Sequence, residues 1–494
     1  MQINQEFVMF QFLKQLAANA IKIVIKRPKP KVPMQPTGDL THYLNDPTTP
    51  DLIEKISYDD ATNRIAKLDL KFVVDGFAGG GHDLNSSPGR AANCCVTTLK
   101  TLEWVQAHKF KKIPNWATTQ ILSVQPDAGE DLNAYYDRTA VKLFSLKNWH
   151  TSNSCDILAH ELGHAIFDAL RPDTWSVQAI EIWAFHETFG DLSALFTVLQ
   201  SDKMIEKMLS ETNGDLSKSN AVSKVAEEVG KVVYDLTGGE KGRDPAFLRN
   251  AANDFKYVDP TTLSEEETYD TISAECHSFS RILTGTMYEI FVMMYNQCLS
   301  QGMKNTDAVK AARDTLIRYA LRAACFVPAV PKFYEAFAKT VLWVDWSTTK
   351  EYHDRMWEIF ERRGIISSVK SMAVKRRTQV IGQSIAKGRN GSTLVKGGKI
   401  ETRKLADLMP ISAQSYNPLY YKNIELASES IYIFEKNGHS FEYMEPSEKE
   451  QLKAAKYCLD RLHQTNSVSN DPKTPFVVKR GKLIRTNYKC LYCR

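Results

Sequence analysis

The chain has 494 residues, of which 43% are hydrophobic, so it is long enough for two or three domains with a substantial core. Its formal net charge of +5 is small for this length and gives no reason to expect nucleic acid as a partner. The nine cysteines are odd in number and lack the spacing of a disulfide framework, which favours a reducing compartment.

Residues 1–35 are expected to form an N-terminal helix followed by a linker. Residues 6–25 have an amphipathic pattern, and residues 26–33 are basic and rich in proline. Such a helix beside basic residues could lie on a membrane surface, although an ordinary helix with a stiff linker is the commoner arrangement. The apolar run at 7–14 has no basic region before it, and no segment has the length of an apolar bilayer span. We therefore expect a cytoplasmic protein, or one exported by a route without a classical signal peptide.

Residues 36–89 are expected to form a short N-terminal segment. It contains a strand-like run at 70–74 and a glycine-rich stretch at 76–82. That stretch lacks the Lys-Ser/Thr ending of a phosphate-binding loop, so we expect a flexible turn there. A helix is then predicted at 97–105 and a strand at 121–124.

Residues 152–171 contain no proline and carry apolar side chains at helical spacing, which predicts one buried helix. His160 and His164 lie four residues apart within it, so both imidazoles share one face of the helix, one turn apart. Two neutral nitrogens at this spacing suit a zinc ion. Glu161 points to the adjacent side of the same turn, where it could act as the general base of an HExxH motif. A helix rich in Ile, Leu and Ala could also be plain core, so a third ligand is needed to decide.

A third ligand follows 23 residues after His164. Residues 182–196 are again apolar at helical period and carry Glu187 and Asp191, four residues apart. If this helix packs antiparallel to the first, across the break at 171–173, Glu187 completes a His, His, Glu set with an open fourth position, as in catalytic zinc sites. Asp191 is then placed to accept the free N–H of a ligand histidine and fix its tautomer.

These motifs resemble the thermolysin family of zinc metalloproteases, in which HExxH is followed by an ExxxD motif. Three further segments occur in the order of that family: 131–136 reads Asp-Leu-Asn-Ala-Tyr-Tyr, 247–250 reads Phe-Leu-Arg-Asn, and 277–283 reads His-Ser-Phe-Ser-Arg-Ile-Leu. The resemblance extends over residues 90–345. It implies a zinc-dependent endopeptidase that acts on peptide or protein substrates.

The resemblance also implies roles for individual residues near the zinc. Asn133 and Ala134 match the edge strand that holds an extended substrate. Arg249 matches the arginine that binds the substrate carbonyl beyond the scissile bond, and His277 matches the histidine that stabilises the transition state. Without the zinc helix, an ordinary edge strand, a surface ion pair and a helix cap would be the simpler interpretations of these residues.

The family's pocket for the residue after the scissile bond is lined by side chains that match Ile157 and Leu248. Both are apolar, so the resemblance implies a preference for an apolar residue at that place in the substrate.

The sequence departs from the family in three respects. His186 precedes Glu187 where the family has a small polar amide, and Trp175 stands where its transition-state tyrosine is expected. After Tyr136 the chain has too few clustered carboxylates for a cage of six to eight oxygens, so we predict no structural calcium there.

Strands before the metal helix and helices after it predict an α+β fold. By the resemblance, this would be a thermolysin-like catalytic domain with a β-rich upper lobe, a helical lower lobe and the zinc helix between them. Residues 36–89 are too short for the full inhibitory propeptide of secreted relatives, so they would be at most a reduced pro-segment. Long helices are predicted at 221–236, 277–298, 306–324 and 332–342, and the expected domains are 1–35, 36–89, 90–345 and 346–494.

Residues 346–494 are expected to form a small basic α+β extension, with a strand-like run at 430–434 and a helix-like run at 448–462. The chain ends in a CxxC motif, Cys490 to Cys493, whose spacing to other cysteines and histidines is not typical of a zinc site. The extension could position substrates, bind a partner or cover the cleft. The N-terminal and C-terminal segments are both candidates for autoinhibition.

The prediction from the sequence is thus a zinc endopeptidase with one catalytic zinc ion, in which Glu161 is the general base. The alternative is a catalytically silent or self-inhibited, zinc-stabilised binding protein that acts through its C-terminal extension. The intact Glu161 disfavours that alternative, because structural zinc has no use for a base. An aminopeptidase would need an acidic anchor for the substrate amine, and none is evident near Asn133.

Overall fold

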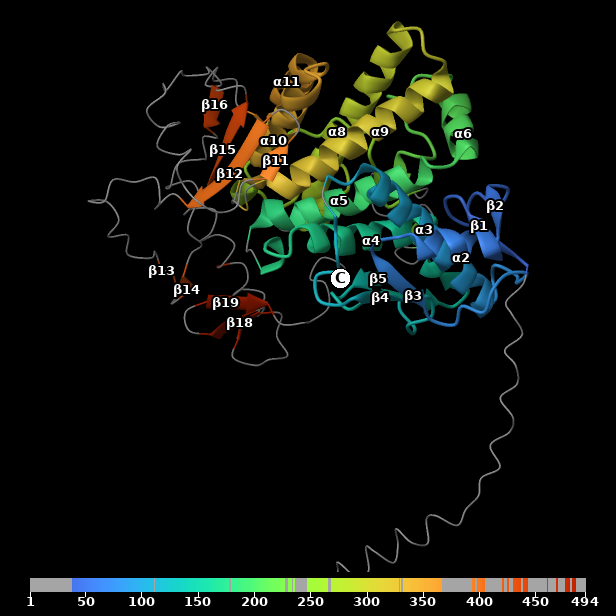
Figure 1. The fold of residues 1–494 in the computed structure, drawn as a ribbon. Coiled ribbons are helices and arrows are strands. Elements are labelled where there is room, and N and C mark those ends of the chain that lie inside the picture. The colour runs from blue at the N-terminus through green and yellow to red at the C-terminus, as the bar shows by residue number, and fades with distance from the viewer. Residues whose placement is uncertain are drawn as a thin grey trace, which may run out of the picture. The chain divides into compact units, whose positions relative to one another are not determined.

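The computed structural model describes residues 38–366 apart from 111, 177–178, 227–229, 233, 236–246, 265–267, 328 and 330–331, and short pieces between 393 and 485 (Figure 1). The predicted N-terminal helix and linker, nearly all of the helix predicted at 448–462, and the terminal CxxC motif lie outside the described residues.

A four-stranded mixed sheet has the strand order β3-β4-β6-β5. Its strands are β3 (Lys71–Val74), β4 (Ile121–Gln125), β5 (Ala134–Tyr136) and β6 (Ala140–Leu143). Strands β3, β4 and β6 are parallel, and β5 pairs antiparallel with β6 at the edge of the sheet. Because parallel strands need a crossover connection, the chain between β3 and β4 contains the long helix α3 (Ser87–His108). The strands predicted at 70–74 and 121–124 and the helix predicted at 97–105 are confirmed.

The predicted segment 36–89 shares the main hydrophobic core. Its hairpin of β1 (Asp39–Tyr43) and β2 (Ile53–Ser57) packs on α3, and helix α2 (Tyr58–Ala66) follows. Leu40 and Leu44 are 0% and 2% exposed and belong to the same apolar cluster as the metal helix. Together with β3, these residues form part of the folded body.

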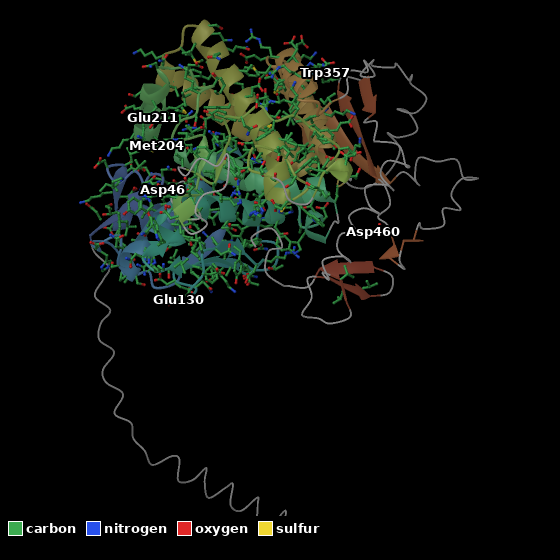
Figure 2. The ribbon with its side chains drawn as sticks, turned by 180° about the vertical axis from the view of Figure 1, so that it is seen from behind. Asp46, Glu130, Met204, Glu211, Trp357 and Asp460 are labelled. Atoms are coloured by element: carbon green, nitrogen blue, oxygen red, sulfur yellow. The ribbon has the colours of Figure 1, made fainter. Side chains whose placement is uncertain are left out.

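The predicted metal helix, α4 (Cys155–Leu170), packs on strands β5 and β6, and helix α5 (Ile180–Val198) packs on α8 (Cys276–Ser300). Figure 1 shows the α4–α5 pair between the sheet and the later helices. Figure 2 labels Met204, a fully buried residue of α6 (Asp202–Thr212), and Glu130, an exposed residue before β5. The remaining helices are α9 (Asn305–Phe326), α10 (Phe333–Thr348) and α11 (His353–Arg362). The helices predicted at 277–298, 306–324 and 332–342 are confirmed.

The helix predicted at 221–236 is wrong over its first half. There the chain turns and then forms the two-residue strand β9 (Lys224–Val225), which pairs antiparallel with β10 (Arg249–Asn250). Ala226 has a positive φ of 55°, and its N–H donates to the buried Asp156 carboxylate of α4. A helical backbone would lose both this bond and the pairing with Arg249, so the tertiary contacts outweigh the local helical pattern.

Beyond residue 366, the described pieces are mainly short strands. One sheet has the order β11-β12-β15-β16 and includes β15 (Ser430–Lys436), at the place of the strand predicted at 430–434. The other strands of that sheet are β11 (Thr393–Val395), β12 (Gly398–Lys404) and β16 (His439–Glu442). Strands β13 (Tyr420–Tyr421) and β14 (Ile424–Glu425) form a two-stranded sheet. A three-stranded sheet has the order β17 (Val468–Ser469), β18 (Phe476–Lys479) and β19 (Lys482–Arg485). None of the helices in the described part of the chain combines the length and apolar character that a membrane span needs.

Candidate metal centre and active site

Helices α4 and α5 form an antiparallel hairpin with an unusually close approach. Successive contacts run in opposite directions along the two helices: His160 with Asp191, Gly163 with Gly190, and Phe167 with Phe185. A Cβ atom on Gly163 would lie 2.8 Å from the Cα atom of Gly190, so the two backbones meet there. One turn away, a Cβ atom on Gly190 would lie 2.6 Å from Cε1 of His160, so Gly190 provides the space for the imidazole ring.

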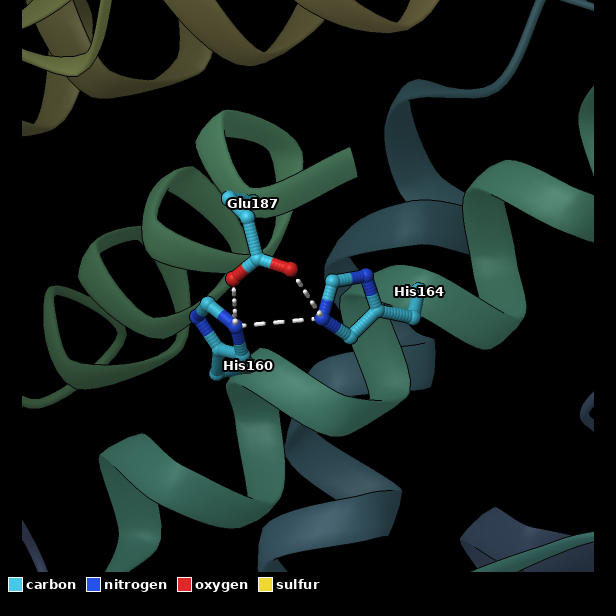
Figure 3. Close-up of side chains that lie close together, drawn as sticks. All are labelled: His160, His164 and Glu187. Carbon is cyan, nitrogen blue, oxygen red and sulfur yellow. Dashed lines mark hydrogen bonds and ion pairs between the residues drawn. The ribbon is translucent and has the colours of Figure 1, made fainter. Parts of the chain in front are cut away.

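This hairpin brings the three predicted metal ligands together (Figure 3). Nε2 of His160 lies 3.1 Å from Nε2 of His164 and 3.2 Å from a carboxylate oxygen of Glu187. Nε2 of His164 lies 3.6 Å from the other Glu187 oxygen. All three side chains are buried.

The donor set fits a tetrahedral metal ion. Ligand atoms about 2.0–2.1 Å from a tetrahedral zinc ion lie about 3.3 Å from one another, which is close to the spacing of these three atoms. Both carboxylate oxygens of Glu187 are buried, and apart from imidazole nitrogens 3.2–3.6 Å away they have no hydrogen-bond partner among the described residues. A buried charge is costly unless it is paired, and a cation at the centre of the three ligands would pair with it directly.

The charges around the cluster also favour a cation. Burial lowers the pKa of His160, but the carboxylates of Asp191 and Glu187 reverse this effect and raise it to about 9. Burial and the neighbouring charge of His160 hold the pKa of His164 well below its usual value. The carboxylates thus attract positive charge, which protons or a metal ion can supply, and metal binding would release protons.

Asp191 lies next to the cluster and contacts two of the predicted residues. One of its oxygens is 3.1 Å from Nδ1 of His160, the nitrogen that faces away from the ligand cluster. The same oxygen accepts hydrogen bonds from Nε and Nη2 of Arg249, at 3.2 and 2.8 Å. Burial alone would raise the pKa of Asp191, but the charge of Arg249 and the contacts with His160 hold it well below its usual range. Asp191 therefore orients both a candidate metal ligand and a candidate substrate-binding residue.

Glu161 points toward the edge strand of the sheet. Its side chain is buried, and its carboxylate accepts a hydrogen bond from the backbone N–H of Tyr136 at the end of β5. Burial raises the pKa of this carboxyl group to about 7, partly offset by the charge of His160. A carboxyl group with a pKa near neutrality can both accept and return a proton, as a general acid–base catalyst must.

His277 contacts the same Glu187 oxygen as His160 does. Its Nε2 is 3.3 Å from a Glu187 oxygen, and its Nδ1 is 2.6 Å from a carboxylate oxygen of Glu275. Burial lowers the pKa of His277, but the charges of Glu187 and Glu275 reverse this and raise it to about 9. The two carboxylates thus favour the protonated, donating form of the His277 ring.

The sequence did not single out Glu275, which has two functions in the structure. It is the N-cap residue of α8, where its second oxygen accepts the N–H of Ser278 at 2.9 Å, and it holds the ring of His277. Its position immediately before a predicted helix start was the available signal, but Glu is not a preferred N-cap residue.

Asn133 and Ala134 lie at the start of β5, which is the predicted edge strand. The Asn133 side chain accepts a hydrogen bond from the N–H of Ala134, and its backbone carbonyl accepts one from Thr151. Ile157, on the first turn of α4, is 8% exposed and lies in the main apolar cluster, and Leu248 is partly buried against the same cluster.

The far end of β5 is fastened to the C-terminal half of α4. The Tyr136 hydroxyl donates to the buried Asp168 carboxylate, and Arg138 binds the same carboxylate through two nitrogens at 2.9 Å. The Arg138 guanidinium lies 4.9 Å from the ring centre of Trp175, which is 2% exposed and also packs edge-on against His186. The residue at the place of the family's tyrosine is therefore a packing residue in this chain.

No family model matches the chain, and no curated protein matches its sequence. Among solved structures, the chain is similar to the precursor of protealysin, a metalloproteinase from Serratia proteamaculans, at 13% identity and a TM-score of 0.37. The match covers 58% of this chain and 80% of that chain. The neighbour is distant, so a functional assignment has to come from the geometry of the site.

Proposed function

We propose that the protein is a zinc-dependent endopeptidase. The observation that carries this proposal is the position of Glu161: a buried carboxyl group with a pKa raised to about 7, next to a buried His160, His164 and Glu187 cluster. A purely structural metal site would not need an acid–base group there. Two histidines and one carboxylate leave a fourth position open, as in catalytic zinc sites.

A zinc ion bound to these ligands would make a water molecule more acidic and would polarise a substrate carbonyl. Glu161 accepts the proton of the attacking water and later donates it to the leaving amine. The backbone N–H of Tyr136 orients the Glu161 carboxylate for both transfers. His277, held by Glu275, donates from Nε2 to the oxygen on which negative charge develops.

The substrate would lie along the edge strand β5. An extended peptide can pair with such an edge through its main chain, and Asn133 and Ala134 would contact it once the Asn133 side chain releases the Ala134 N–H. Arg249 uses Nε and Nη2 for Asp191, which leaves the Nη1 end of its guanidinium for a substrate carbonyl. Ile157 and Leu248 would line the pocket for an apolar residue after the scissile bond.

The test is cleavage of a diverse peptide library by the full-length chain, with bound zinc quantified in the same preparation. We expect internal cuts before apolar residues and one zinc ion per chain. Glu161→Gln should keep the zinc and lose about 10²–10⁴-fold in rate, the usual contribution of a general acid–base group. Glu181→Gln, which changes a buried carboxyl group of α5 whose pKa is also raised to about 7 and whose hydrogen bonds come from Tyr257 and Tyr334, is a control for folding.

Two outcomes would contradict the proposal. Near wild-type cleavage by Glu161→Gln would show that Glu161 is not the base. A preparation with one zinc ion per chain that cuts no peptide, even after trimming of either end, would favour a zinc-stabilised binding protein.

A further inference from the structure

A second group of metal-ligating side chains lies beside the first. Among the described residues, Glu187, Cys276 and His277 each offer a ligand atom within 4.8 Å of the other two. Cys276 and His277 are not used by the first cluster, and the proposed reaction has no role for a thiol. We propose that these three residues form a second metal position, which stops turnover when it is filled.

The orientation of His277 suits it for this role. Its Nδ1 lies 2.6 Å from Glu275, and its Nε2 lies 3.3 Å from an oxygen of Glu187. A carboxylate that holds one ring nitrogen as N–H leaves the other nitrogen available to a metal, which is the usual arrangement for metal-bound histidine. Nε2 is therefore the ligand atom, and it faces the shared carboxylate.

Cys276 supplies the sulfur ligand. Its Sγ atom lies within 4.8 Å of a ligand atom of His277 and of Glu187, and the residue is 7% exposed. The sulfur is beside the Nδ1 edge of the ring, 3.7 Å from Nδ1 and 3.2 Å from a Glu275 oxygen, so it would approach a metal on Nε2 from that edge. Cys94, Cys95, Cys155 and Cys298 are also buried, but none of them has two further ligands within reach in the described part of the chain. Cys276 is thus distinguished by its neighbours and not by burial.

Glu187 would be shared between the two positions. One of its oxygens lies 3.6 Å from His164, and the other lies 3.2 Å from His160 and 3.3 Å from His277. A carboxylate with two oxygens can bridge neighbouring metal ions, as in two-metal sites. Because Nε2 of His277 would then bind metal, it could not donate to the substrate oxygen, so occupancy should inhibit.

The ligand set also indicates which ions would enter. A thiolate, an imidazole and a carboxylate together suit zinc, cobalt or cadmium and not calcium or magnesium, and thiolate favours the softer ions. The first cluster contains no sulfur. The two positions should therefore differ in spectrum, because only the second would show a thiolate–metal charge-transfer band.

The experiment loads reduced, chelator-treated full-length protein with Co²⁺, and measures bound metal and near-ultraviolet absorption. We expect the first equivalent to bind without a thiolate–cobalt band and the second to produce one. Cys276→Ser should keep the first equivalent and lose the band. It should also lower the metal affinity of the second site by at least about 10–100-fold, which is the usual cost of losing an outer-shell partner. Cys298→Ser, a buried cysteine of the same helix, should behave as wild type.

A second measurement does not depend on a variant. In the wild-type protein, two equivalents of Zn²⁺ should protect Cys276 from alkylation, as read by peptide mass mapping, whereas one equivalent should not. Absence of the band in wild type, its persistence in Cys276→Ser, or equal alkylation at one and two equivalents would each overturn the proposal.

Only the inhibitory effect rests on the proposed peptidase function. In a peptidase assay, excess Zn²⁺ should inhibit wild type and Cys298→Ser at lower concentration than Cys276→Ser. A charge-transfer band in a protein that cuts no peptide would support the second metal position and contradict the proposed peptidase function. Peptide cleavage without a band would support the peptidase function and contradict the second metal position.

Discussion

The metal half of the site, His160, His164 and Glu187, stands in the middle of two helices that touch backbone to backbone, and these side chains are 0–7% exposed. The substrate half, Arg249 and His277, stands on a two-residue strand and on the first turn of a helix, with side chains 11% and 28% exposed. Metal ligands tolerate little displacement, whereas residues that meet a variable peptide can be held by fewer contacts. Asp191 joins the two halves, because it contacts both His160 and Arg249.

If the metal half depends on the close helix contact, Gly190→Ala should have the largest effect. The new Cβ atom would lie 2.6 Å from Cε1 and 2.7 Å from Nδ1 of His160, so the ring must move. A displacement near 1 Å can cost about 100-fold in rate, and we expect at least this loss in kcat/KM together with weaker zinc binding. Gly163→Ala separates displacement of the ring from separation of the helices, because its Cβ meets the Gly190 backbone and Ser193 and not the imidazole. Equal zinc loss in both variants would show a general packing effect.

Asp191→Asn should damage both halves. Loss of the carboxylate beside Nδ1 of His160 should weaken zinc binding about 10–100-fold. It also leaves the buried Arg249 without its partner, which should lower the free energy of unfolding by about 3–5 kcal/mol. Zinc titration and denaturant unfolding measure the two effects. Thr284→Val removes only one hydrogen bond to Asp191 and should cost about 1 kcal/mol with normal zinc affinity.

Glu275→Gln should affect the substrate half alone. The neutral amide can still accept the N–H of Ser278 at the helix start, but it removes a charge that holds His277. We expect kcat to fall about tenfold with little change in KM or zinc content, because the ring loses its fixed orientation. A parallel fall in bound zinc would mean that the two halves are not separable.

Glu181→Gln should change stability and leave turnover unaltered. Burial raises the pKa of Glu181 to about 7, against hydrogen bonds from Tyr257 and Tyr334. Between its unfolded value of about 4.5 and about 7, the native state holds a proton that the unfolded state loses, so stability falls as pH rises. The full difference is about 3 kcal/mol, since one pKa unit corresponds to about 1.36 kcal/mol. Unfolding free energies from pH 4 to 8 should decline in wild type and stay flatter in the variant.

The metal half was largely predictable from the sequence, because it depends on the spacing of residues within single helices. The four-residue spacing of His160 and His164 fixes their common face, and the same spacing relates Glu187 to Asp191. Their convergence across the hairpin was a prediction from the helix pattern and the family resemblance, and the structure brings the three ligands together.

The remaining contacts were not predictable, because they depend on which distant segments meet. Glu275 and the β9–β10 pair became visible only once residues 224–277 were placed around α4 and α5. Arg138 and Trp175 likewise meet only through packing, and the cation–aromatic contact between them has no sequence signature. A helical period predicts one face of one element, but not its tertiary partner.

The order of the elements along the chain has a consequence for synthesis on the ribosome. The four-stranded sheet, α4 and α5 are all complete by Val198, so His160, His164 and Glu187 have been made before Arg249 and His277 exist. Domains fold as they emerge, N-terminal part first. A nascent chain therefore acquires these three candidate ligands about 90 residues before it acquires the histidine proposed to act on substrate, a delay of about 5–18 seconds at about 5–20 residues per second.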